Sequence, residues 1–144
     1  MKARAVLLRH PGDVVLGADT TVVLDGQMLA KPADEREAAT MLRSLSGRAH
    51  EVLTGVALVS AAAERSAVER TTVVMTRLAE DEIAWYVASG EPRDKAGAYA
   101  IQGLASRFIP RLEGSYSNVV GLPVAAVLQL VKEMGLSGIL TRVR

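Results

Sequence analysis

The segment DVVLGADTTVVLDGQMLAKP, residues 13–32, decides the fold because it has the pattern of a β-hairpin in one uninterrupted run. Val and Leu dominate its first half, and after Asp19 the β-branched pattern resumes as TTVVL. Asp25-Gly26 follows, a dipeptide typical of two-residue hairpin turns. We therefore predict two antiparallel strands joined at this turn.

Helical and strand patterns alternate after the hairpin. Asp34 and Glu37 form a capping box ahead of an apolar helical face that ends at Gly47. Helices are predicted on such signals at residues 33–47, 79–90 and 122–135. Further strands are predicted at residues 50–60, 68–76 and 106–112. The first two of these should pair as a long hairpin, and Pro110 restricts the third to an edge or a bulge.

This order of elements predicts an α/β fold on a mixed sheet flanked by helices. With 144 residues, 49% of them hydrophobic, the chain can bury one sizeable core, so we expect a single domain over residues 1–144. Residues 136–144 show no clear period.

Composition argues against several classes of function. The formal net charge is +1, and there are only five aromatic residues (one Trp, three Tyr and one Phe), which favours neither a nucleic acid nor an anionic membrane as the partner. The absence of cysteine excludes disulfides and thiolate zinc sites, and we find no signal peptide and no membrane-spanning run. We expect a cytoplasmic protein.

Few polar residues have a spacing that indicates catalysis. His10 and His50 have no metal-spaced neighbours, so we interpret them as surface or strand residues. Asp19 is different, because an unpaired carboxylate inside an apolar strand is costly to bury. Two interpretations are open: Asp19 caps backbone N–H groups at a strand end, or it lines a pocket where it holds a divalent cation or takes a proton from water.

Two further segments are open to two interpretations each. Lys31 is by default a solvated residue at the hairpin exit, but it reaches the Asp19 pocket and meets a phosphate if the hairpin folds back. Residues 94–103, DKAGAYAIQG, can form a tight surface turn in which Asp94 and Lys95 pair. Alternatively, Gln102 faces a ligand, since its amide can match the edge of uracil or thymine.

Four segments, in this order along the chain, resemble the Maf family of nucleoside triphosphate pyrophosphatases. They are GADTTVVLDGQMLAKP (17–32), AATMLRSLSGRAHEVLTGVAL (38–58), YVASGEPRDKAGAYAIQG (86–103) and EGSYSNVVGLPV (113–124). The resemblance covers about residues 2–135. It implies an elongated mixed sheet with a central cleft, and cleavage of a nucleoside triphosphate to the monophosphate and pyrophosphate with the help of Mg²⁺ or Mn²⁺.

The resemblance also assigns roles to residues. Asp19 falls on the family's proton-accepting aspartate. Thr20 and Gln102 fall on positions that separate family branches, and this combination resembles the branch that acts on dTTP and UTP. The remaining matches are polar pocket positions expected to bind substrate: Lys31, Asp94 and Lys95.

Family members begin with a strand that leads into a Ser-x-Ser-Pro-Arg-Arg loop and a helix, and this sequence contains no such motif. We therefore expect a Maf-like domain without its first strand-loop-helix unit, with a homodimer as a possible assembly. A non-catalytic nucleotide-binding or dimerisation module of the same fold is the alternative function.

Overall fold

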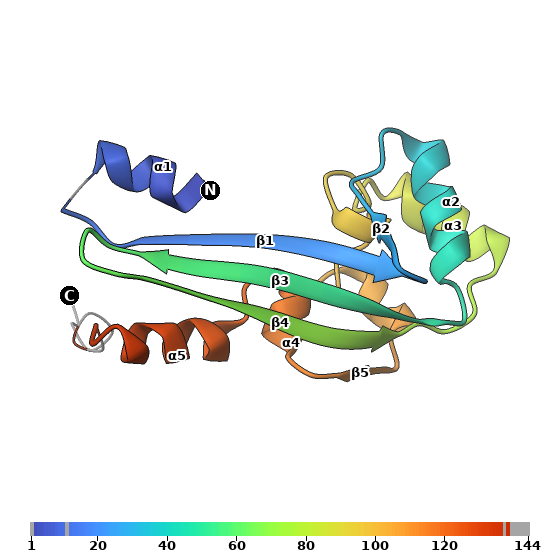
Figure 1. Cartoon of the computed structure of the whole chain (residues 1–144). Helices are drawn as coiled ribbons and strands as arrows, with labels where there is room; N and C mark the ends of the chain where they lie inside the picture. Colours follow the sequence, from blue (N-terminus) through green and yellow to red (C-terminus); the bar gives the residue numbers. More distant parts are fainter. Residues whose placement is uncertain (1, 11, 137, 139–144) are drawn as a thin grey trace.

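Three long strands form the axis of the molecule, with helices at both ends (Figure 1). The structure, a computed structural model, describes residues 2–10, 12–136 and 138. The strand order is β2-β1-β3-β4-β5, and every neighbouring pair is antiparallel. The strands are β1 (Val15–Leu24), β2 (Gln27–Leu29), β3 (Ala49–Val59), β4 (Glu64–Val74) and β5 (Arg111–Glu113).

Both predicted hairpins are confirmed. Asp25 and Gly26 have φ values of 51° and 77°, the left-handed conformations that a type I′ turn requires at both central residues. β3 and β4 pair along their whole length. The α/β class is confirmed as well, but the described strands pair only antiparallel and not in a mixed sheet. The reason is that β3 begins at the end of the sheet where β1 stops, so that Val23 lies opposite Glu51.

Five α-helices and two short 3₁₀ helices are described. They are α1 (Lys2–Arg9), α2 (Glu35–Leu45), α3 (Glu80–Ala88), α4 (Tyr116–Val120), α5 (Val124–Glu133), η1 (Ala96–Ala98) and η2 (Leu104–Phe108). Asp34 caps α2 as predicted, because its carboxylate accepts the Glu37 N–H at 2.8 Å. None of the described helices has the length and apolar character that crossing a bilayer requires.

The differences from prediction lie in short elements. Of the predicted strand 106–112, only the end belongs to β5, because residues 104–108 form η2 instead. The short helices α1 and α4 were not predicted. Of the aperiodic segment 136–144, only Leu136 and Gly138 are described.

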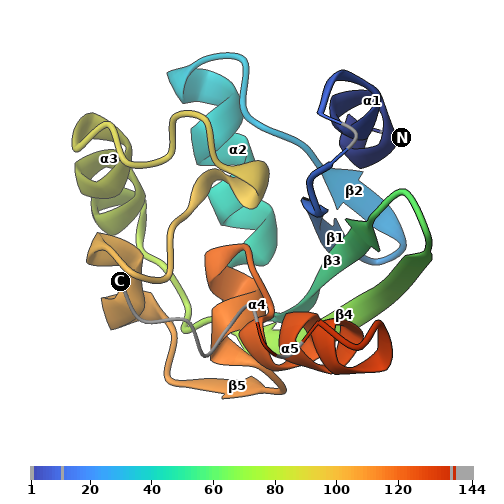
Figure 2. The same ribbon diagram turned by 90° about the vertical axis from the view of Figure 1, so that its left-hand side faces the viewer.

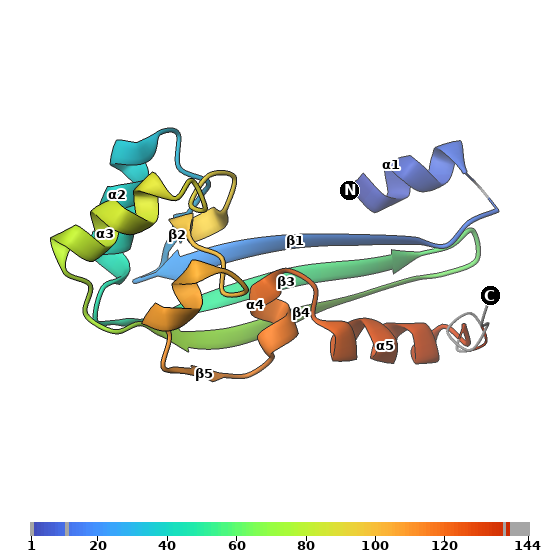
Figure 3. The ribbon, with the colours of Figure 1, turned by 180° about the vertical axis from the view of Figure 1, so that it is seen from behind.

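Different helices cover the two faces of the sheet formed by β1, β3 and β4: α1 lies on one face and α5 on the other (Figure 2, Figure 3). Successive β3 side chains point to opposite faces: Ala57 and Val59 pack against α1, whereas Val56 and Leu58 pack against α5. At the other end of the sheet, α2, α3, η1 and η2 enclose the largest core cluster. Figure 3 shows α4 between these two ends, and it contacts β3 and β4.

Candidate active site

A cavity of about 240 Å³ lies where the middle of β1 meets the segment around η1. We call it the Asp19 cavity. It is lined by Ala18, Asp19, Thr20, Val22, Lys31, Val52, Asp94, Ala96, Tyr99, Val119, Val120 and Gly121. Four of the residues singled out from the sequence therefore lie around one space, including Lys31, which the hairpin does bring back to Asp19.

Asp19 lies in the interior of β1, opposite Gly55 of β3, and its side chain is exposed. The interpretation of Asp19 as a strand-end cap is therefore wrong, and the expected burial cost does not arise. Within the part of the chain that the structure describes, the carboxylate has no hydrogen-bond or ion-pair partner. It also borders a second cavity of about 630 Å³ over Gly17, Gly55 and Ala57.

The β1 side of the cavity, residues 18–22, is supported by a buried polar network. We call this side the strand wall. The Thr20 and Thr54 hydroxyls lie 2.9 Å apart, and the Thr20 hydroxyl donates to the Gly121 carbonyl at 3.4 Å. Asn118 is fully buried behind them, and its side-chain amide donates to the carbonyls of Val52 at 3.1 Å and Glu69 at 3.3 Å. These contacts join β1, β3, β4 and the α4 segment.

The sequence analysis did not identify Asn118 or the capping roles of Ser115 and Ser117. Ser115 caps α4 by accepting the Asn118 N–H at 3.1 Å, and Ser117 accepts the Val124 N–H at 3.1 Å, at the start of α5. Serine is a preferred N-cap residue, so Ser115 ahead of residues 116–120 could have located α4. Both serine side chains therefore accept backbone N–H groups at the start of a helix, which is a structural role.

The opposite side of the cavity, residues 94–99, is irregular backbone, and we call it the loop wall. Asp94, Gly97 and Ala98 have φ values of 59°, 72° and 65°. A Cβ on Gly97 would lie 2.9 Å from Val22 Cγ1, so only glycine allows this close approach to β1. The Gly97 N–H donates to the Ala30 carbonyl at 3.3 Å, which holds the loop wall next to Lys31.

Tyr99 anchors the loop wall to the sheet. Its hydroxyl lies 2.6 Å from Nε2 of His50 on β3, and both side chains are buried. Burial lowers the pKa of His50 to about 4, so the imidazole is neutral at neutral pH, and burial also raises the pKa of Tyr99. His50 is thus a buried strand residue, as one of the two sequence interpretations had it.

Two predicted site residues lie outside the Asp19 cavity. Lys95 and Gln102 do not line it, although both belong to the segment that carries Asp94 and Tyr99. Gln102 is exposed, in the turn that follows the loop wall. Gln102 therefore follows the loop wall in the chain but does not line the Asp19 cavity.

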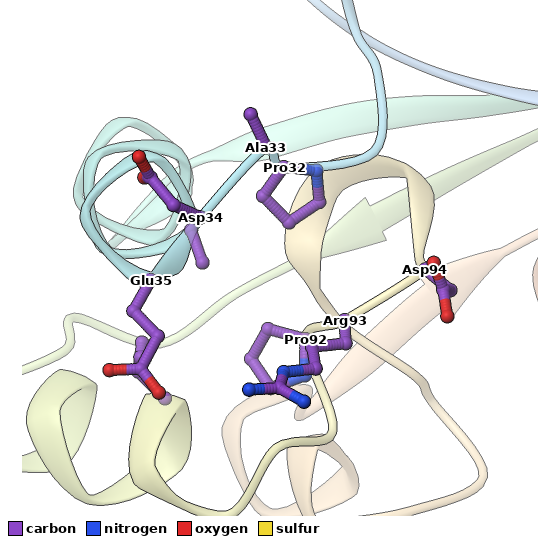
Figure 4. A pocket seen from close by; sticks show the side chains of 9 residues that line it. Pro32, Ala33, Asp34, Glu35, Pro92, Arg93 and Asp94 are labelled. Carbon is purple, nitrogen blue, oxygen red and sulfur yellow. The ribbon is translucent and has the colours of Figure 1, made fainter.

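Carboxylates near the site fall into two groups. A neighbouring cavity has a volume of about 420 Å³. Asp34 and Glu35 lie on its α2 side, and Asp94 lies apart from them beyond Arg93 (Figure 4). In the described ranges, no group of three or more His, Asp or Glu residues is arranged to hold a metal. Mg²⁺ commonly uses one or two carboxylates together with substrate phosphates. Asp19 and Asp94 in the Asp19 cavity fit that mode of binding.

Comparison with known proteins gives a consistent result. Residues 1–134 match the family described as Maf-like protein. A dTTP/UTP pyrophosphatase of Symbiobacterium thermophilum is 55% identical over 134 residues, which cover 93% of this chain and 69% of the relative. A dTTP/UTP pyrophosphatase of Deinococcus radiodurans is 53% identical, with 95% and 70% covered. For the Pyrococcus abyssi protein of the same name, the values are 49%, 91% and 70%.

Proposed function

The chain belongs to the Maf family, and on this premise we propose that it hydrolyses dTTP and UTP to the nucleoside monophosphate and pyrophosphate. The observation that carries the proposal is the Asp19 cavity, where two neighbouring residues of β1, Asp19 and Thr20, and Lys31 after β2 line one space. Relatives that are 53–55% identical to this chain over the matched residues are named for this activity.

Asp19 is the proposed general base. It accepts a proton from the water that attacks the α-phosphorus, a new P–O bond forms, and the bond between this phosphorus and the bridging oxygen breaks so that pyrophosphate leaves. The carboxylate suits this role because Asp19 lines the cavity, is exposed and has no competing partner among the described residues. Lys31 lines the same cavity and would balance phosphate charge.

A divalent cation, Mg²⁺ or Mn²⁺, is part of the proposal, and it would supply charge neutralisation on the phosphate oxygens. Asp94 and Asp19 are the carboxylates that line the Asp19 cavity and would meet such an ion beside the substrate. Lys95, next to Asp94 in the chain, would add positive charge at the edge of the site.

Discrimination between bases is assigned to Thr20 and Gln102. Thr20 lines the strand wall, and Gln102 carries an amide that can pair with the carbonyl and N–H shared by uracil and thymine. We place this activity in the cytoplasm because nucleoside triphosphates are formed there, and we propose a homodimer as the assembly.

The test is pyrophosphate release from a panel of nucleoside triphosphates, with and without Mg²⁺ or Mn²⁺. The expected result is metal-dependent turnover that is fastest with dTTP and UTP. Thermal stabilisation by these nucleotides without any turnover would support the non-catalytic nucleotide-binding alternative instead. Equal turnover of nucleoside triphosphates with different nucleobases would show that Thr20 and Gln102 do not select the nucleobase.

A further inference from the structure

Residues 92–103 form a loop that carries Asp94, Lys95 and Gln102 and starts directly after Glu91. We propose that Glu91 is a positioning residue that closes this loop and thereby places the substrate-binding side chains. The inference deepens the proposed function and rests on it for its kinetic consequences. Glu91 does not line the Asp19 cavity, so it acts through the loop and not by touching the substrate.

The Glu91 carboxylate joins the two ends of the loop. Oε2 accepts the Leu104 N–H at 2.9 Å, and Oε1 accepts the Ala105 N–H at 3.3 Å. Both donors belong to the first turn of η2, which follows Gln102 directly after Gly103. One side chain at the start of the loop therefore holds the backbone at its end.

Tyr86 completes the closure from the core. Its hydroxyl donates to Glu91 Oε1 at 2.6 Å and accepts the Ala100 N–H at 3.1 Å, which ties the middle of the loop to the same carboxylate. The ring is fully buried on α3 and packs edge-on against Phe108, with centroids 5.8 Å apart. Because the ring is held by packing, the hydroxyl is a fixed point for both partners.

Gly103 is required for the carboxylate to reach these donors. A Cβ at Gly103 would collide with the Glu91 carboxylate, so any larger residue would displace it from the Leu104 and Ala105 N–H groups. The glycine is needed for this close approach and not for its backbone conformation, since a φ of −102° is open to any residue. The pair of Glu91 and Gly103 therefore brackets the loop.

The closure is charged at neutral pH. Burial by itself would raise the pKa of Glu91. The hydrogen bonds from Tyr86, Leu104 and Ala105 and the positive charge of Lys95 all lower it, and together they outweigh burial, so the pKa lies below its usual value. Hydrogen bonds to an ionised acceptor are stronger than neutral ones. The interaction with Lys95 also connects the closing carboxylate to a proposed phosphate-binding residue.

The kinetic experiment uses Glu91→Gln, which replaces one acceptor oxygen by an NH₂ group facing backbone N–H donors, and Tyr86→Phe, which removes only the bridging hydroxyl. The expected result is a rise in KM for dTTP of roughly tenfold for Glu91→Gln and less for Tyr86→Phe, with kcat within about threefold of wild type, because misplaced contacts weaken substrate binding before they alter the chemistry at Asp19. Glu82→Gln is the matched control, since Glu82 accepts the Ala79 N–H on the exposed side of α3. Its KM should equal that of wild type.

Hydrogen exchange on the free proteins provides a readout that does not depend on turnover. In Glu91→Gln and Tyr86→Phe, the exchange rate should rise in peptides covering residues 94–105 and stay at the wild-type level in all other peptides. In Glu82→Gln, exchange over residues 94–105 should equal that of wild type. Wild-type exchange and KM in Glu91→Gln would overturn the inference, and so would a loss of protection over the whole chain in Tyr86→Phe. An inactive wild-type protein would contradict the proposed function, while local exchange would still decide the role of Glu91.

Discussion

The two walls of the Asp19 cavity are built by different kinds of interaction. The strand wall is part of a regular ladder in which β1 pairs residue by residue with β3. The loop wall has three residues with positive φ and is held by side chains and close approaches: Tyr99 on His50, and Gly97 on Val22. The strand wall should therefore tolerate changes of chemistry without changes of shape, whereas the loop wall should lose its shape when a single contact is altered.

The strongest test of the strand wall is Asp19→Asn, which removes the proposed base and preserves the shape of the side chain. We expect turnover of dTTP to fall by about 10²–10⁴-fold, the usual contribution of general acid–base catalysis. The melting temperature should stay at the wild-type value because Asp19 is exposed and unpartnered among the described residues. Unchanged pyrophosphate release would remove Asp19 from the base role.

Asn118→Ala tests the network behind the strand wall. The change removes the donor to the Val52 and Glu69 carbonyls and leaves a buried void, so we expect the free energy of unfolding to fall by about 2–4 kcal/mol in urea denaturation. Gln129→Ala, at an exposed position of α5, is the matched amide control and should change stability by less than about 0.5 kcal/mol. Equal stabilities would mean that the ladder alone holds this wall.

The pH dependence of stability tests the anchor of the loop wall. The pKa of His50 is about 4 in the folded protein, whereas an unperturbed histidine has a pKa of 6.5. Between these values the unfolded chain binds the extra proton, so His50 should lower the free energy of unfolding by about 3 kcal/mol as pH falls from about 6.5 to 4. His50→Gln should lose this part of the slope. A slope equal to that of wild type would show that His50 is not buried in its neutral form.

Gly97→Ala tests the close approach of the two walls. The new methyl group would meet Val22 at a backbone φ of 72°, so we expect a loss of about 1–2 kcal/mol in the free energy of unfolding. Val22→Ala removes the atoms that the new methyl group would meet. The double variant should therefore lose less unfolding free energy than the sum of the losses in the two single variants. Strict additivity in this double-mutant cycle would mean that only backbone strain matters.

Local signals predicted the hairpins and the main helices but missed α1, α4 and the irregular segments. The Asp25-Gly26 turn, the Asp34 cap and the β3–β4 hairpin each depend on neighbours in the sequence, so their patterns were sufficient. Residues 106–108 were predicted to start a strand, yet they belong to η2, whose first residue, Leu104, donates its N–H to a carboxylate thirteen positions earlier. Propensity contains no information about a partner at that distance.

In the candidate site, too, some residues could be identified from local signals and others could not. Asp19 was identified by its place in an apolar run, and the resemblance to the Maf family pointed to the same residue. That Lys31 and Asp94 lie around the same cavity as Asp19, while Gln102 does not line it, depends on how the hairpin and the loop fold over β1. His50, Tyr99 and Asn118 have no local signal of importance, because their roles come from burial next to partners on other elements.

By itself, the sequence determined the class of fold, its hairpins and its main helices, and it singled out Asp19 as the proposed base. Those properties follow from side-chain periodicity and turn chemistry, which act between near neighbours. Only the tertiary structure decided that the described strands pair antiparallel throughout, which residues share the cavity, and that Glu91 closes the loop beside it. These depend on contacts between residues far apart in the chain, whose geometry is set by the packing of the whole core.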